Sequence, residues 1–214
     1  METDTITLWG GGTGRTHRTL WFAEEMGIPY EHEPIGPRTG ETKTEEYLAI
    51  NPRHKVPALV HGATVITESA AILAYLNEAF PAPEGIFVPR TALERAQLLS
   101  WSFFVMTELD ATAIYSIRRH EQLTDVYGAS PVAAKAGREY FRYQLDRMED
   151  AIKATGDFLM GEFSMADVLL MSSLDAAGNF GIELSPFYAD WRSHIAKRRA
   201  YRKTFSQNYP DRPL

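Results

Sequence analysis

The sequence has no cysteine among its 214 residues. A chain without cysteine has no disulfide framework, no thiolate ligand for a metal ion and no thiol nucleophile of its own. It also lacks the pair of cysteines, two residues apart, on which thioredoxin-type redox proteins depend. These absences exclude whole classes of chemistry, whereas they say little about the compartment in which the protein works.

Excess positive charge and long hydrophobic runs are also missing. The formal net charge is −6 and the isoelectric point is near 5.5, which gives no general attraction to nucleic-acid phosphates or anionic lipids. Charged residues interrupt each apolar stretch before it reaches the roughly 20 residues of a membrane span. The acidic start of the chain lacks the basic and apolar regions of a secretory signal. We therefore expect a cytoplasmic protein without nucleic-acid or membrane partners.

Hydrophobic periodicity in the first 80 residues predicts an α/β domain. An alternating, β-prone segment over 5–9 is followed by the glycine-rich loop 10–14 and by a helical pattern over 16–26. Gly27 stands where helices commonly end. The remaining predicted elements are an extended segment over 30–35, a helix over 44–50, hairpin strands over 56–60 and 64–67, and a helix over 68–80. This order predicts one mixed sheet with helices packed against it.

An all-helical domain is predicted after a proline-rich break. Strand patterns stop at the candidate linker 81–90. We expect one domain over 1–80 and a second over 91–214. Within the second, Ser164 and Asp167 have the spacing of a capping box, which we interpret as a structural helix start. Apolar residues at helical spacing predict helices over 93–120, 132–154, 165–178 and 187–203.

The segment from Asn51 to Leu59 contains the first candidate binding feature. Pro57 opens the predicted strand, where a proline cannot donate to the sheet. If the peptide bond between Val56 and Pro57 is cis, the neighbouring backbone turns outward, and Val56 can pair with an extended peptide through its amide and carbonyl groups. The alternative is that Pro57 simply begins an edge strand.

Thr67, Glu68 and Ser69 form the second feature, between the hairpin and the next helix. A helix start carries unpaired N–H groups and partial positive charge, which suit a carboxylate, and the Ser69 hydroxyl adds a donor. Glu68 can pair with an ammonium group. Together these groups match the α-amino and α-carboxylate groups of an amino acid. The alternative is an ordinary N-cap at Thr67 with an acidic residue in the first turn.

Over nearly its whole length the sequence resembles the cytosolic glutathione transferase family, in its bacterial type. The segments that carry the resemblance are specific in their order and spacing. They are residues 16–31, the stretch from Asn51-Pro52 through Val56-Pro57-Ala58-Leu59, Thr67-Glu68-Ser69 leading into 71–76, and 163–168. The resemblance implies an α/β thioredoxin-like N-terminal domain, an all-α C-terminal domain and a homodimer. It also implies glutathione as the co-substrate and a role in detoxification.

Family positions assign the glutathione contacts to particular residues of this chain. Val56 corresponds to the residue that holds the cysteinyl backbone of glutathione. Glu68 and Ser69 correspond to the contacts of its γ-glutamyl end. His54 and Lys55 stand where family members contact the glycyl carboxylate.

The residue that activates the glutathione thiol is predicted in the loop 11–16. Counting back from Arg18, which matches the family's arginine on the first helix, Thr13 falls at the serine position of some classes. Thr13 is the predicted donor, and Thr16 and Arg15 are the alternatives. Lowering a thiol pKa from about 8.5 by about two units takes roughly 2.7 kcal/mol, which one charge-assisted hydrogen bond beside a helix N-terminus can supply. A glycine-rich turn whose threonines only cap the helix is the remaining interpretation.

The second substrate is expected to contact the helix over 93–120. The candidate residues carry aromatic or cationic side chains that suit a small, hydrophobic electrophile, although an aromatic stripe at helical spacing is more often part of a core. They are Trp101, Phe104, Tyr115 and Arg118. The six histidines show no metal-ligand spacing, so no metal is expected.

The predicted activity is that of a glutathione transferase, in which an activated thiolate attacks the electrophile. Several other reactions of bound glutathione stay open: peroxide or disulfide reduction, ether cleavage and isomerisation. A non-catalytic glutathione-binding or scaffold protein of the same fold is the alternative from another class, and the loop around Thr13 is where activity would have been lost.

Overall fold

The computed structural model describes residues 5–213, and the chain divides into two compact units. One unit runs up to Val88 and includes the chain again from Ala196, and the other is Pro89–Ile195. The predicted second domain extends over 91–214, whereas the structure groups the segment that begins at Ala196 with the first unit. Residues 1–4 and 214, at the outer ends of the predicted domains, lie outside the described residues.

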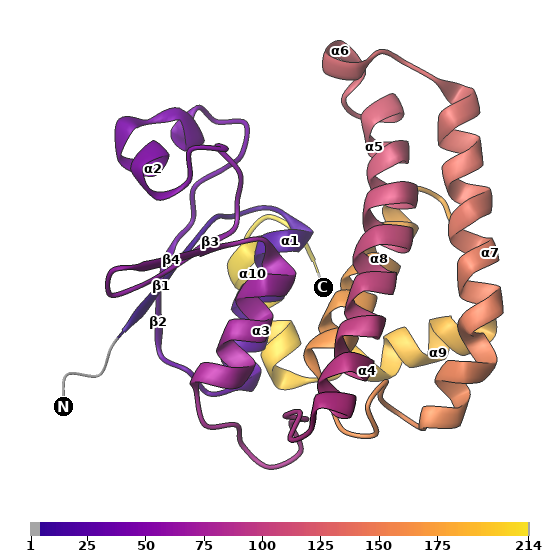
Figure 1. The fold of residues 1–214 in the computed structure, drawn as a ribbon. Helices are drawn as coiled ribbons and strands as arrows, with labels where there is room; N and C mark the ends of the chain where they lie inside the picture. The colour runs from indigo at the N-terminus through magenta and orange to yellow at the C-terminus, as the bar shows by residue number, and fades with distance from the viewer. Residues whose placement is uncertain (1–4, 214) are drawn as a thin grey trace. The chain divides into compact units, whose positions relative to one another are not determined.

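A mixed sheet in the order β2-β1-β3-β4 forms the base of the first unit (Figure 1). β1 pairs parallel with β2 and antiparallel with β3, and β3 pairs antiparallel with β4 through a tight turn. The strands are β1 (Ile6–Trp9), β2 (Tyr30–Glu33), β3 (Ala58–His61) and β4 (Thr64–Thr67). The predicted strand–helix–strand unit and the predicted hairpin are both confirmed.

Helices of the first unit pack against this sheet and against one another. α1 packs on α3 and also on α10, which comes from the far end of the chain (Figure 1). The core between sheet and helices is apolar, with Leu8, Phe22 and Ile72 fully buried. The helices are α1 (Gly14–Glu25), the short η1 (Glu41–Lys43), α2 (Glu45–Ile50), α3 (Ser69–Ala79) and α10 (Arg199–Asn208).

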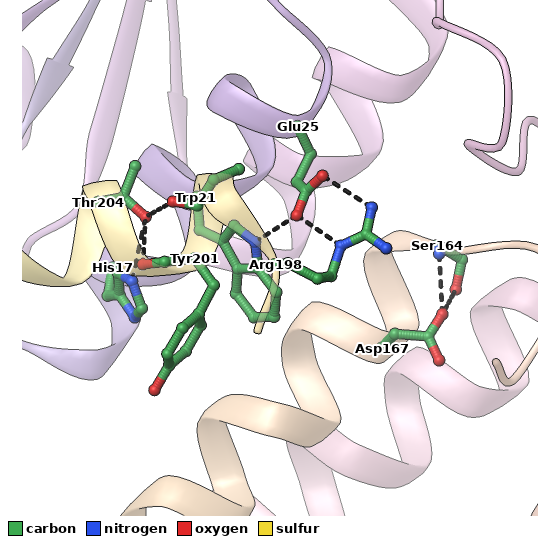
Figure 2. Close-up of polar contacts among 9 residues, drawn as sticks. His17, Trp21, Glu25, Ser164, Asp167, Arg198, Tyr201 and Thr204 are labelled. Atoms are coloured by element: carbon green, nitrogen blue, oxygen red, sulfur yellow. Dashed lines mark hydrogen bonds and ion pairs between the residues drawn. The ribbon is translucent and has the colours of Figure 1, made fainter. Parts of the chain in front are cut away.

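Polar contacts hold α10 against α1 (Figure 2). Glu25 accepts from Trp21 Nε1 at 2.8 Å, and its two oxygens accept from Arg198 Nε at 2.7 Å and Nη2 at 2.8 Å. His17 Nε2 lies 3.2 Å from Thr204 Oγ1, whose own hydrogen goes to a helix carbonyl, so the imidazole is the donor. Burial, followed by the charge of a neighbouring arginine, lowers the pKa of His17 to about 4, against the raising effect of a backbone hydrogen bond.

Helices alone make up the second unit. The helix predicted over 93–120 is present as α4, η2 and α5 in succession, and this column lies beside α7 (Figure 1). η2 is a π-helix, so the 3.6-residue spacing used to predict its faces does not apply within it. The elements are α4 (Ala92–Phe103), η2 (Phe104–Ile114), α5 (Tyr115–Glu121), α6 (Thr124–Tyr127), α7 (Pro131–Thr155), α8 (Met165–Asn179) and α9 (Pro186–Ile195). Among residues 5–213, none of the helices has both the length and the apolar character needed to cross a membrane.

The prediction of one helix over 187–203 is wrong. The structure has two helices there, α9 and α10, and they belong to different units. The backbone at Arg198 leaves the helical region, with φ −60° and ψ 132°. Arg198 is the N-cap of α10 and pairs with Glu25 of α1, so the chain after the break packs on α1 instead of continuing α9.

The predicted capping box at the start of α8 is confirmed. The Asp167 carboxylate accepts from the Ser164 N–H at 2.8 Å and the Ser164 hydroxyl at 2.6 Å (Figure 2). It also accepts from the Leu159 N–H at 2.8 Å. Burial raises the pKa of Asp167 to about 6, against the lowering effect of these hydrogen bonds. The box therefore holds a fully buried carboxyl group in the core of the helical unit.

Candidate functional site

The sheet brings three segments to one edge. Trp9 at the end of β1 lies opposite Ala58 at the start of β3, and Ala58 lies opposite Thr67 at the end of β4. The loop after β1, Val56 before β3 and Glu68 after β4 therefore leave the sheet side by side. The family resemblance implies the glutathione contacts and the thiol donor in these same segments.

Gly10, directly after β1, needs to be glycine. Its φ is +127°, and a Cβ at this position would lie 2.8 Å from both Thr16 Oγ1 and Val56 Cβ. Cβ atoms do not come that close to other heavy atoms, so any side chain would push the two residues away. Thr16 of α1 and Val56 thus converge on the end of β1.

Thr13 is the N-cap of α1, with extended backbone at φ −126° and ψ 150°. Its Oγ1 accepts the Thr16 N–H at 3.1 Å and lies 2.9 Å from Thr16 Oγ1. The interpretation of Thr13 as a helix cap is therefore correct. Capping uses a lone pair of the oxygen and leaves the hydroxyl hydrogen, which is available to a ligand when Thr16 donates its own hydrogen to Thr13.

Burial separates the three residues predicted to activate the thiol. Thr13 and Arg15 are half-buried, whereas Thr16 is fully buried. The Thr16 hydroxyl meets Thr13 rather than the surface. Thr16 can therefore act on a ligand only through Thr13, while the other two residues can face one directly.

Val56 stands before β3 and takes no part in its ladder. The Val56–Pro57 peptide bond is cis. Val56 is half-buried, and within residues 5–213 no backbone hydrogen bond reaches its N–H or C=O group. The edge at Val56 can therefore accept an added strand.

Buried polar groups fix the loop that precedes Val56. Asn51 Nδ2 donates to the Lys55 carbonyl at 2.8 Å, and the Tyr47 hydroxyl donates to the same carbonyl at 2.6 Å. Burial raises the pKa of Tyr47 to about 12, partly offset by a hydrogen bond to Asn51, so the phenol keeps its proton as a donor. The side chains of His54 and Lys55 are exposed, and His54 has φ +48°.

Glu68 occupies an unusual backbone conformation in front of α3. Its φ of +72° and ψ of 119° lie where few residues other than glycine are found. Strain of this kind costs about 1–3 kcal/mol and is concentrated at binding and active sites. His54 has the only other positive φ of a non-glycine residue within 5–213, so both such positions coincide with predicted glutathione contacts.

Hydrogen bonds at the start of α3 overturn one interpretation of the second feature. The N-cap is Glu68 and not Thr67, because Thr67 Oγ1 accepts from Arg53 Nη2 at 2.7 Å. Arg53 Nη1 lies 3.1 Å from Glu68 Oε1 in an exposed ion pair. Buried Ser69 accepts from Arg18 Nη1 at 3.3 Å, which ties α1 to α3.

The sequence pattern predicts no role for Arg53 or Asn51. Both lie inside the segment that carries the family resemblance, and that position is the one sequence signal that points to them. Spacing alone does not reveal that Arg53 bridges to Thr67 and Glu68 across the hairpin.

The residues predicted to contact a second substrate lie in the second unit. Trp101 of α4 and Phe104 of η2 are half-buried, with ring centroids 6.3 Å apart. Tyr115 and Arg118 of α5 are also half-buried, and the Arg119 guanidinium lies 4.6 Å from the centre of the Tyr115 ring. Across the described part of the chain, no group of three or more histidine, aspartate or glutamate side chains is arranged to hold a metal ion.

Comparison with known proteins points to the glutathione transferase family. Residues 15–79 match the glutathione S-transferase N-terminal domain. Maleylacetoacetate isomerase from Rattus norvegicus is 32% identical over 192 residues, covering 87% of this chain and 83% of the relative. Glutathione S-transferase A from Pleuronectes platessa is 25% identical over 226 residues, covering 100% of this chain and 96% of the relative.

A solved structure agrees with these matches. The theta class glutathione S-transferase from Xanthomonas axonopodis pv. citri, with glutathione bound, has a TM-score of 0.79 and 28% identity to this chain. The alignment covers 94% of this chain and 97% of that one. The chain therefore belongs to the glutathione transferase family.

Proposed function

We propose that this protein binds glutathione and activates its thiol for attack on a small electrophile. The observation that carries the proposal is the alignment of the loop at Thr13, the backbone at Val56 and the strained Glu68 along one sheet edge. Neighbouring strands are about 4.8 Å apart, so the edge from β1 across β3 to β4 spans roughly 10 Å. An extended tripeptide covers about the same distance.

Each part of glutathione then has a group of matching chemistry. The cysteinyl backbone pairs with Val56 as an added strand. The γ-glutamyl ammonium pairs with Glu68, and its carboxylate meets the N-terminus of α3 at Ser69. Lys55 supplies positive charge for the glycyl carboxylate, and His54 supplies an imidazole N–H donor. The cysteine thiol then lies toward the loop after β1.

Thr13 activates the thiol as a hydrogen-bond donor and not as a base. Its oxygen is held by the Thr16 N–H, and a hydrogen given to it by the Thr16 hydroxyl frees its own for the thiolate. A hydrogen bond to a charged group contributes about 1.5–3 kcal/mol, or roughly one to two units of thiol pKa. Arg15 adds positive potential at the same helix start.

Replacing Thr13 by alanine is expected to raise the pKa of the bound thiol by about one to two units, because the donor is lost. Ultraviolet titration of the thiolate in the glutathione complex measures this shift. Thr13→Ser keeps both the cap and the donor and is the matched control. A native complex whose thiol titrates at its free value would indicate a binding protein without activation. An unchanged pKa in Thr13→Ala, with a raised one in Arg15→Gln, would move the role to Arg15.

The variant Glu68→Gln is expected to bind glutathione about tenfold more weakly, since a charge-assisted bond to the ammonium group is lost. Its melting temperature should stay close to that of the native protein, because the ion pair with Arg53 is exposed. Calorimetric titration with glutathione measures the affinity. Glu31→Gln, an exposed change on β2, is the control. Equal affinities of the two variants would remove Glu68 from the site.

We assign the electrophile to the helical unit, with Trp101, Phe104, Tyr115 and Arg118 as its contacts. The proposal includes the homodimer and the cytoplasmic location that the family resemblance implies. A screen of small electrophiles, with alanine variants of these residues, tests the assignment. Loss of turnover with one electrophile and not another would identify the residues that select it.

Glutathione-dependent isomerisation is the second candidate reaction, favoured by the 32% identity to a maleylacetoacetate isomerase. A thiolate that adds to a carbon–carbon double bond and then leaves can isomerise the bond without net use of glutathione. Incubation with maleylacetoacetate separates the two candidates. Product formation with constant total thiol supports isomerisation, and a thiol loss equal to the product supports conjugation.

A further inference from the structure

The last turn of α10 is bonded to the loop that carries Thr13. The Gly12 N–H donates to the Asn208 carbonyl at 3.2 Å, and Asn208 Nδ2 donates to the Thr13 carbonyl at 3.0 Å. Asn208 is only 2% exposed. Asn208, from a distant part of the chain, thus hydrogen-bonds both the N–H of Gly12 and the carbonyl of Thr13.

The chemistry of the partners fixes how the Asn208 amide is turned. The Thr13 carbonyl can only accept, so the nitrogen of the amide must face it. The same carbonyl accepts the His17 N–H at 3.0 Å as the first bond of α1. The peptide group after Thr13 is therefore held by the helix and by Asn208 together. The Asn208 carbonyl is one of the helix-end acceptors that α10 leaves without an internal partner, and Gly12 satisfies it.

A second chain of hydrogen bonds reaches the same loop from Gln207. The Tyr30 hydroxyl donates to Gln207 Oε1 at 3.0 Å, which leaves Gln207 Nε2 to donate to His32 Nδ1 at 3.0 Å. His32 Nε2 then carries the hydrogen that it gives to the Gly10 carbonyl at 2.8 Å. Burial, with the charge of Glu24, raises the pKa of Tyr30 to about 12, so the first donor keeps its proton. Consecutive residues of α10 thus fix the loop at both of its ends.

The composition of the loop explains why it needs such support. Glycine occupies four of the five positions from Gly10 to Gly14, and glycine has the largest conformational freedom of any residue. Gly10 and Gly12 both have positive φ. A hydrogen bond weakens steeply once its angle falls below about 120°. A donor carried on this loop therefore depends on contacts from outside the loop.

We propose that Asn208 is a positioning residue for thiol activation, which holds the Thr13 N-cap in the orientation that presents its hydroxyl to the ligand. The inference rests on the proposed function, in which Thr13 donates to the glutathione thiolate. Asn208 acts through the Thr13 carbonyl and does not touch glutathione. Its effect is therefore on activation, while the affinity for glutathione depends on Val56, Glu68 and Ser69.

Asn208→Leu tests the proposal, because leucine has a similar shape and no amide donor. The measurements are the ultraviolet titration of bound glutathione and its Kd. We expect the thiol pKa to rise by about one unit, which is about tenfold less thiolate at a pH below the pKa, with Kd changed by less than about threefold. Asn208→Ala removes the same donor without adding apolar volume, and it serves if the leucine variant fails to fold.

Arg198→Ala is the matched control, because it breaks the ion pair at the other end of α10 and leaves the loop contacts intact. Its melting temperature should fall while its thiol pKa stays native. A native thiol pKa in the Asn208 variants would overturn the positioning role and leave the proposed function standing. An equal rise in Arg198→Ala would assign the effect to helix docking in general and overturn the role of Asn208. A native complex whose thiol pKa equals the free value would overturn both proposals.

Discussion

Replacing Asp167 by alanine is expected to destabilise the helical unit by about 3–5 kcal/mol. Asp167 is fully buried, and its carboxylate is the common acceptor for the Ser164 N–H, the Ser164 hydroxyl and the Leu159 N–H. Each donor left without a partner costs about 1–3 kcal/mol, and the lost side chain leaves a cavity. Asp167→Asn is expected to recover part of this loss, because the amide oxygen still accepts a hydrogen bond. The recovery is incomplete because the NH2 group replaces an acceptor and faces donors.

Chemical denaturation followed by circular dichroism measures the effect, and Asp190→Ala, an exposed change in the same unit, is the control. A loss below about 1 kcal/mol in Asp167→Ala would mean that the capping box contributes little to the fold.

Because the native pKa of Asp167 is about 6 and its ordinary value is 3.8, the native state binds the proton more tightly between these values. The part of the stability that comes from protonation of this group is therefore greatest in acid and is lost as the pH rises through about 6.

His17, in the first unit, is expected to give the free energy of unfolding a pH dependence of the opposite sign. Its native pKa is about 4 and its ordinary value 6.5, so the unfolded state binds more protons between these values. The free energy of unfolding should therefore fall by about 3 kcal/mol as the pH drops from about 6.5 to about 4. The physical reason is that acid must charge an imidazole buried among the aromatic rings of Trp21, Tyr201 and Phe205.

His17→Gln removes the titrating group and retains a donor for Thr204. The loss of unfolding free energy between pH 7 and pH 4.5 should be smaller in this variant by about 2 kcal/mol. Hydrogen exchange resolved by peptide can measure each unit separately, with the exposed His194→Gln as the control. Equal acid sensitivity of the native protein and His17→Gln would show that other groups set the acid stability of the first unit.

Helices and strands that local sequence patterns mark could be predicted from the sequence. Boundaries that lie at contacts between distant parts of the chain could not. The alternation in β1 and the apolar spacing of α1 are local, and both were found. Nothing local marks the break between α9 and α10, which has no glycine or proline. Arg198, which stands at the break, pairs instead with Glu25, 173 positions away in the chain, and no local pattern reveals that contact.

The residues of the candidate site likewise fall into those that local spacing predicts and those that distant contacts bring together. Val56, Glu68 and Ser69 lie in short segments whose spacing was informative, and sheet register brings those segments together. The link between Asn208 and Thr13 joins residues 195 positions apart, and an asparagine near a helix end is too common to predict it. The π-helical geometry of η2 is likewise not revealed by its apolar composition.

The position of α10 in the chain also sets the order in which the protein can be completed during translation. Ribosomes add roughly 5–20 residues per second, so Thr13 is made on the order of ten to forty seconds before Asn208. The intervening helical unit can fold in that interval, while the first unit still lacks a helix of its core. The unit whose synthesis begins first therefore folds last. The hydrogen bonds that hold the glycine-rich loop 10–14 can form only after Asn208 has left the ribosome.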